Sequence, residues 1–151
     1  MKSALFVLLT IVTLNANAKC VDAFVTHIVD GDTLDANMNS EIVRVRLDGI
    51  DAPEIGQTWG AWARAALKRK VGRKNVCIVV TDTDRYGREI GRIYLDKRDI
   101  NREMVRHGHA WWYRQYSNDV RLDHAAHDAR HDKAGLWKGT DPVPPWEWRR
   151  R

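Results

Sequence analysis

The chain has 151 residues, of which 25 are lysine or arginine and 20 are aspartate or glutamate, so its formal net charge is +5. After the first eighteen residues no stretch is long and apolar enough to cross a bilayer, which excludes an integral membrane protein. The remaining length fits one domain with a single core. A moderately basic balance favours a polyanionic partner such as nucleic acid, although many proteins with this balance bind none.

Residues 1–18 have the pattern of a signal peptide. A lysine precedes the apolar run 4–12, and Ala16-Asn17-Ala18 is a small-x-small cleavage site. Lys19 stands where a lipidation site needs a small residue, which argues against a lipid anchor on Cys20. We therefore expect a secreted or periplasmic protein that does not bind membranes once it is processed.

Cys20 and Cys77 are the two cysteines of the chain. An even number of cysteines in an oxidising compartment predicts a disulfide, and two unpaired thiols are the alternative. The bridge would close a loop of more than fifty residues and join the first strand to a later one.

Alternating apolar and polar residues predict three strands, joined by tight turns, at about 21–29, 33–37 and 41–47. In the third strand Val45 and Leu47 lie on one face and Arg46 on the other. We therefore expect Arg46 to point away from that apolar face, where it can reach a ligand.

A helix is predicted next, with Thr58 as its N-cap. Its apolar stripe has helical spacing and consists of Trp59, Trp62, Ala63, Ala66, Leu67 and Val71. The solvent side carries basic residues, among them Arg64 and Lys68.

Two more strands are expected, one beginning at Val76 and one over 88–95. Helices follow over about 99–107 and from about Asn118 to Gly135, before an extended tail rich in proline and tryptophan (about 139–151). This order predicts an α+β fold in which a five-stranded β-barrel carries three α-helices on its outside.

Carboxylates and arginines concentrate in three separated segments: Asp30-Gly31-Asp32-Thr33, Arg46 to Glu54, and Asp84-Arg85-Tyr86-Gly87-Arg88. Each segment alone is typical of an ordinary turn. Together they supply oxygen ligands for a divalent cation, a spare carboxylate to act as a base, and two guanidinium groups for a phosphate. The combination suits hydrolysis of a phosphodiester bond.

In order and spacing, these segments closely resemble the staphylococcal nuclease-like (thermonuclease) family, with Arg46 five residues before Asp51 and Glu54 three after it. The likeness extends over nearly all of the chain after residue 20. It implies that the barrel is an OB-fold and that residues 19–151 are one nuclease-like domain.

The resemblance assigns metal binding to Asp32, Asp51 and the backbone carbonyl of Ala52, with Ca²⁺ as the cofactor. The family has a threonine at the position of Ala52, but a carbonyl survives that change. Asp30 is a candidate for an outer ligand that binds through water.

The resemblance also assigns the catalytic roles. Glu54 matches the general base, and Arg46 and Arg88 match the arginines that stabilise charge on the phosphate. Tyr86 matches a tyrosine that contacts the nucleotide phosphate, and either Tyr113 or Tyr116 is expected to stack on a base.

Other signals carry less weight. His124, His127 and His131 share one helical face and form a candidate zinc site, but a solvated face explains them better. Arg149-Arg150-Arg151 is expected to add nonspecific attraction to phosphate or nothing.

We therefore expect an exported, monomeric, calcium-dependent endonuclease that hydrolyses DNA and RNA with low sequence specificity and leaves 3′-phosphates. A nonenzymatic OB-fold binding module is one alternative, but such a module needs no complete set of acids and arginines. An accessory nuclease that serves a plasmid or conjugation complex is another alternative.

Overall fold

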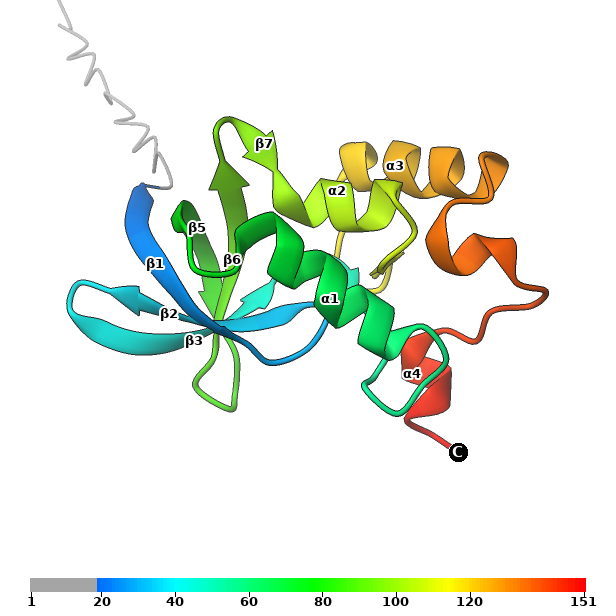
Figure 1. Ribbon diagram of the computed structural model, residues 1–151, viewed down its shortest axis with the longest axis horizontal. Coiled ribbons are helices and arrows are strands. Elements are labelled where there is room, and N and C mark those ends of the chain that lie inside the picture. Colours follow the sequence, from blue (N-terminus) through cyan, green and yellow to red (C-terminus); the bar gives the residue numbers. More distant parts are fainter. Residues whose placement is uncertain (1–18) are drawn as a thin grey trace, which may run out of the picture.

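The computed structural model describes residues 19–151 (Figure 1). The predicted signal peptide, residues 1–18, lies outside the described residues. Within the described part of the chain no helix is both long and apolar enough to cross a membrane.

Five main strands form a closed barrel. The sheet order β3-β2-β1-β5-β6-β7 is antiparallel between neighbours, and a parallel pairing of β3 with β6 closes it. Each main strand places a fully buried aliphatic side chain in the interior, namely Val25, Leu34, Val45, Ile78 and Ile93. The strands are β1 (Cys20–Ile28), β2 (Thr33–Met38), β3 (Glu41–Leu47), β5 (Asn75–Thr83), β6 (Glu89–Leu95) and the short β7 (Arg98–Asp99).

A second, two-stranded sheet lies beside the barrel. It pairs β4 (Ile50–Asp51) with β8 (Trp111–Trp112), and Asp51 lies opposite Trp111. The sequence pattern did not reveal these strands because each has only two residues. Their pairing matters because it fixes the segment that follows β3.

The helices lie to one side of the β1–β2–β3 hairpins, with α1 crossing the front of the molecule (Figure 1). Their bounds are α1 (Gly60–Val71), α2 (Ile100–Arg106), α3 (Val120–His131), the 3-10 helix η1 (Gly135–Lys138) and α4 (Pro145–Trp148). The predicted α+β barrel with helices is confirmed, and α4 is one helix more than the three expected.

A buried asparagine attaches α2 to the barrel where β3 ends. The amide nitrogen of Asn101 donates to the carbonyls of Asp48 and Gly91 (3.0 and 3.1 Å), and its oxygen accepts from the backbone N–H of Ile93 (3.1 Å). Asn101 is completely buried, so these bonds satisfy groups that water cannot reach. The chain is thereby held in place just before it enters β4.

The predicted start of the first helix is wrong in detail. Thr58 is not the N-cap; Trp59 occupies that position with a φ of 74° and makes no side-chain cap bond, and the helix begins at Gly60. Gly60 packs so closely on the carbonyl of Glu54 that a Cβ there would lie 1.8 Å from the oxygen. The buried face of the helix is formed by Gly60, Ala63, Ala66, Leu67 and Val71, whereas Trp62, predicted to be in the core, is 62% exposed.

The sequence predicted an extended tail. This prediction is wrong in part, because four residues of the tail form α4. Pro145 occupies the first turn, where proline's fixed φ and missing N–H are compatible with a helix. The prolines therefore start a helix here instead of preventing one.

The predicted disulfide between Cys20 and Cys77 is present, with the two Cα atoms 5.5 Å apart. β1 and β5 are antiparallel neighbours, and Cys77 lies opposite Asp22. The bridge therefore joins the first residue of β1 to the neighbouring strand β5.

We expect reduction of this disulfide to lower the stability of the fold. The bond joins residues 57 apart, which corresponds to about 4 kcal/mol of loop-closure stabilisation. Urea unfolding with and without reductant measures the difference, and the Cys20→Ser/Cys77→Ser double variant, insensitive to reductant, is the control. Equal midpoints for the oxidised and reduced protein would contradict the prediction.

Candidate active site

The predicted carboxylates converge where the β1–β2 turn, the end of β3 and β4 meet. The backbone N–H of Leu47 donates to the carbonyl of Asp32 (2.8 Å), and Thr33 lies opposite Arg46 in the β2–β3 ladder. Strand pairing thus brings the first acidic segment beside the second, although they are about twenty residues apart in the chain.

Asp32 is held by short bonds on both oxygens. Oδ2 accepts from the backbone N–H of Ala52 (2.6 Å), and Oδ1 accepts from the hydroxyl of Thr33 (3.0 Å). Asp30 lies next to it, and its Oδ1 accepts from the backbone N–H of Asp32 (2.9 Å). Burial and the nearby charge of Asp32 raise the pKa of Asp30 to about 6.

A glycine allows this close approach. A Cβ on Gly31 would lie 2.7 Å from the Cβ atoms of both Ala52 and Ala63, so a larger residue there would push the turn away from α1. Small side chains at all three positions place Asp32 against the backbone that follows Asp51.

Asp51 is the most deeply buried acid of the site, at 1% exposure. Burial raises the pKa of its carboxyl, and two arginines oppose that shift. Nη2 of Arg46 donates to Oδ1 (3.1 Å), and Nη2 of Arg149 donates to Oδ2 (2.8 Å). Both of its oxygens are therefore bound by guanidinium groups.

Arg46 is fixed by the backbone that it crosses. Its Nη1 donates to the carbonyls of Leu47 (3.2 Å) and Ile50 (2.9 Å), and its Nη2 lies 3.5 Å from Asp32 and 3.1 Å from Asp51. One guanidinium thus lies between the two predicted metal ligands, on the side away from Val45 and Leu47 that the alternation in β3 predicted for Arg46.

Glu54 lies at the more open edge of the cluster, with 40% of its side chain exposed. Gln57 holds its backbone by a pair of bonds, in which the N–H of Glu54 donates to Oε1 of Gln57 (3.1 Å) and the N–H of Gln57 donates to the carbonyl of Glu54 (2.8 Å). The carboxylate accepts from Nη1 of Arg149 (2.8 Å). A partly exposed carboxylate beside buried ones suits a base that acts on a water molecule.

Arg149 is the residue of this cluster that the sequence did not reveal. Its guanidinium bridges Asp51 and Glu54 from the C-terminal tail, 98 and 95 positions away. The sequence shows only a run of three arginines after two tryptophans. Such a run is as typical of a solvent-exposed chain terminus as of a binding residue, so it did not identify Arg149.

Arg88 and Tyr86 lie in the β5–β6 hairpin, which forms a separate cluster. Nε of Arg88 donates to Asp84 (2.8 Å), whose other oxygen accepts from the N–H groups of Tyr86 and Arg88. Among residues 19–151 no hydrogen bond or ion pair links Arg88 to Asp32, Asp51 or Glu54. The register places it close by, however, since the next residue, Glu89, pairs with Val45.

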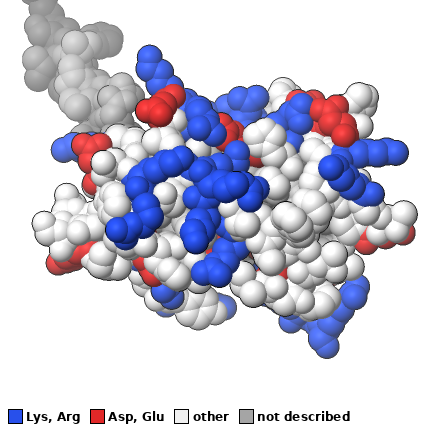
Figure 2. Space-filling view, in the orientation of Figure 1, with Lys and Arg blue, Asp and Glu red and all other residues white. Residues whose placement is uncertain are grey.

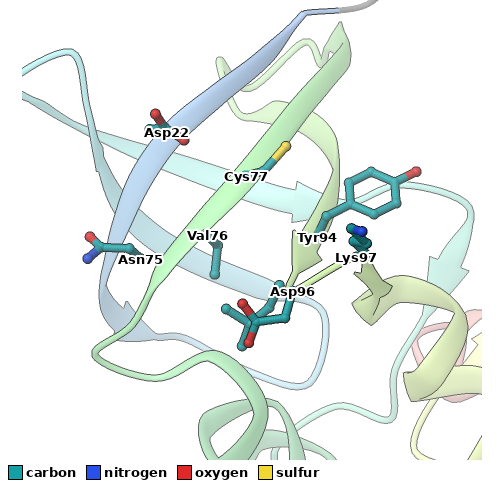
Figure 3. A pocket seen from close by; sticks show the side chains of 8 residues that line it. Asp22, Asn75, Val76, Cys77, Tyr94, Asp96 and Lys97 are labelled. Carbon is teal, nitrogen blue, oxygen red and sulfur yellow. The ribbon is translucent and has the colours of Figure 1, made fainter.

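A surface pocket of about 430 Å³ adjoins this hairpin, lined by Asp35, Ile42, Arg44, Tyr86, Gly87 and Arg88. Tyr86 is 70% exposed at its edge. The pocket supplies room for a phosphodiester chain beside Arg88. A second pocket, of about 440 Å³, lies at the disulfide between β1, β5 and β6 and contains none of the predicted site residues (Figure 3).

The two candidate base-stacking tyrosines contact each other, with ring centroids 4.6 Å apart. The ring of Tyr113 is stacked on Trp146 of α4, with centroids 5.2 Å apart and planes inclined by 3°. Burial and, less strongly, the charge of Asp51 raise the pKa of Tyr113. Tyr116 is 68% exposed. In this structure Tyr116 is therefore the more accessible of the two.

The donor set suits a hard cation. Asp32, Asp51 and the carbonyl of Ala52 offer only oxygen atoms, which Ca²⁺ accepts together with water. No three His, Cys, Asp or Glu side chains gather to hold a metal ion anywhere in residues 19–151. Side chains alone therefore do not complete a site here, and the zinc interpretation of His124, His127 and His131 gains no support.

Comparison with known proteins agrees with this geometry. Residues 44–139 match the family described as staphylococcal nuclease homologue. The chain is 44% identical over 128 residues to an "Uncharacterized endonuclease" of Escherichia coli O157:H7, an alignment that covers 84% of each protein. It is 40% identical over 137 residues to "Protein ParB" of Escherichia coli, covering 83% of this chain and 77% of that protein. It is also 39% identical over 137 residues to a "Micrococcal nuclease" of Shigella flexneri, covering 83% and 79%.

The family match covers more than half of the chain, and the aligned relatives extend it to most of the length. The nuclease-like resemblance and the hydrolase assignment drawn from the sequence are confirmed. The chain belongs to the staphylococcal nuclease family and is a hydrolase that acts on nucleic acids.

Proposed function

We propose that the protein is an exported, calcium-dependent nuclease that cleaves DNA and RNA with low sequence specificity and leaves 3′-phosphates. The observation that carries the proposal is the buried pair Asp32 and Asp51, held around the guanidinium of Arg46 with Glu54 at the open edge. The disulfide supports export, because such bonds persist in oxidising compartments.

Asp32, Asp51 and the carbonyl of Ala52 would hold the calcium ion. When bound, the ion supplies positive charge to a phosphoryl oxygen and to the attacking water. Asp30 lies one residue from the turn glycine and would reach a water molecule of that ion.

Glu54 holds the attacking water and takes its proton as the oxygen bonds to phosphorus. The bond from phosphorus to the 5′-oxygen then breaks, and that oxygen takes up a proton from solvent water and leaves as a 5′-hydroxyl, while the proton held by Glu54 returns to solvent. The phosphate stays on the 3′-oxygen of the other product, so atoms and charge balance without a further reactant.

The arginines stabilise the negative charge that develops on the phosphate oxygens. Arg46 is already positioned by two backbone carbonyls, which reduces its reorganisation during the reaction. Arg88 reaches from the neighbouring hairpin, and its bond to Asp84 uses Nε and leaves the two terminal nitrogens for a phosphate.

Low sequence specificity follows from what the site contacts. The metal ligands and arginines bind phosphate, which is the same in every nucleotide. The tyrosines offer ring faces for stacking, which every base accepts. We therefore place no base-reading residue in the mechanism.

We expect calcium to support cleavage of single- and double-stranded DNA and magnesium to replace it poorly. The proposed site has few side-chain ligands, so backbone carbonyls and water must complete the coordination shell of the cation. Calcium accepts such an irregular shell, whereas magnesium demands a tighter octahedral geometry. Rates of a fluorescent oligonucleotide assay in calcium, magnesium and chelator measure this. Full activity in excess chelator would refute the metal requirement.

Glu54→Gln should lower kcat by about a hundredfold while leaving KM nearly unchanged, because the variant loses a positioned base and keeps the shape of the side chain. Steady-state kinetics on the processed protein test it, with the exposed Glu41→Gln as the matched control. A Glu54→Gln enzyme with the kcat of the wild type would show that the base is misassigned.

A basic band gives a further test of the substrate. Residues 64–74 on and after α1 contain Arg64, Lys68, Arg69, Lys70, Arg73 and Lys74 and no acid. Figure 2 shows this band as a continuous blue area over α1. A phosphate backbone that leaves the active site along α1 would release counterions there.

Lys68→Ala should therefore raise KM and make kcat/KM less dependent on salt. In a plot of log(kcat/KM) against log(salt concentration), the magnitude of the slope should fall by about 0.7–0.9, the value for one lost phosphate contact. Arg102→Ala removes the same charge from an exposed position on α2 and is the control. Equal slopes for the two variants would exclude α1 from the binding surface.

A further inference from the structure

The C-terminal tail is attached to the active site at three points. The carbonyl of Val143 accepts from Nε2 of Gln57 (2.6 Å), in the loop between β4 and α1. Trp146 stacks on Tyr113, and Arg149 bridges Asp51 and Glu54. The tail therefore runs from the β4–α1 loop past Tyr113 to Asp51 and Glu54.

The contact with Arg149 differs from an ordinary surface ion pair. Asp51 is almost completely buried, and the guanidinium reaches both of its oxygens, at 3.2 Å from Nη1 and 2.8 Å from Nη2. The same Nη1 donates to Glu54 at 2.8 Å. Arg149 thus places a positive charge between the proposed ligand and the proposed base.

Arg149 and a calcium ion compete for Oδ2 of Asp51. Arg46 donates only to Oδ1 of that carboxylate, so among the described residues Arg149 alone covers Oδ2. Calcium binds carboxylate oxygens at about 2.3–2.6 Å, and an ion on Oδ2 would lie within repulsive distance of the guanidinium that donates to it. Likewise, a base cannot stack on the face of Tyr113 that Trp146 covers, because the two rings are parallel and in contact.

We propose that residues 143–149 form an autoinhibitory strap, in which Arg149 occupies the cation's place on Asp51 and pairs with the base Glu54, while Trp146 covers Tyr113. Calcium displaces the strap from Asp51, and nucleic acid then takes the face of Tyr113 that Trp146 leaves. The inference rests on the proposed calcium-dependent function. It goes beyond the family likeness, because the family match ends at residue 139.

Pro145 is buried and Trp146 also contacts Trp111, so these residues hold the strap in its closed position. The end of the strap is more accessible: α4 has only four residues, and the side chain of Arg149 is 41% exposed to water and ions. When a protein populates a binding-competent state only in part, its apparent affinity falls by the same fraction. A strap closed in about nine of ten molecules would weaken calcium binding about tenfold.

Isothermal titration of the full mature protein with calcium alone tests the competition without any need for activity. Arg149→Ala should bind calcium about tenfold more tightly than the wild type. Arg150→Ala removes the same charge from the next residue, whose side chain makes no ion pair within the described chain, and should match the wild type. Arg149→Lys keeps the charge without the planar fork and should give an intermediate affinity.

Equal dissociation constants for the wild type and Arg149→Ala would overturn the strap and leave the nuclease proposal intact. If none of the four proteins binds calcium, the calcium proposal fails and the competition fails with it. Weaker binding by a folded Arg149→Ala would show that Arg149 organises the site instead of blocking it, and would also overturn the strap.

The indole N–H resonance of Trp146, assigned with Trp146→Phe, gives a second readout. We expect it to shift as calcium saturates the wild type, and to stand near its calcium-saturated position in Arg149→Ala before calcium is added. A resonance that calcium leaves unchanged would mean that the strap stays closed, which contradicts the proposal.

Discussion

The arrangement of the site depends on the burial of two carboxylates against one guanidinium. Asp32 and Asp51 are both almost inaccessible to water, and two like charges at such close range are costly unless a positive group lies between them. Arg46 supplies that charge and is itself held by the carbonyls of Leu47 and Ile50. The barrel contributes the geometry, because the β2–β3 register places Arg46 opposite Thr33, next to Asp32.

Small residues allow the same cluster to be compact. Gly31 lies in contact distance of Ala52 and Ala63, so the acidic turn, the segment after β4 and α1 meet with almost no side-chain volume between them. The alanine at position 52, where the family has a threonine, keeps the carbonyl and the N–H that bonds to Asp32. The chain thus retains these backbone groups while it lacks a hydroxyl there, which is why the proposed metal site uses the carbonyl of Ala52.

Much of the fold and of the site could be predicted from the sequence because both depend on local patterns. Alternation in the long strands located the barrel, and the spacing of Arg46, Asp51 and Glu54 located the acids. The two-residue strands β4 and β8 were missed because they depend on pairing between segments far apart in the chain. The exposure of Trp62 was missed because helical spacing alone placed this residue on the apolar stripe. Arg149 was missed for a related reason: its role arises from tertiary contact across nearly a hundred residues, and an arginine-rich terminus has no periodicity that marks it.

Two arginines, Arg46 from the barrel and Arg149 from the tail, pair with Asp32, Asp51 and Glu54 in this structure, and whether a calcium ion replaces Arg149 is the central question. A crystal structure of the mature protein with calcium and a short oligonucleotide answers it most directly. We predict an ion bound by Asp32, Asp51 and the carbonyl of Ala52, a phosphate beside Arg46 and Arg88, and Arg149 displaced from Asp51. An ion bound elsewhere, with Arg149 still bridging Asp51 and Glu54 over a bound phosphate, would contradict both the assigned metal ligands and the role of the tail.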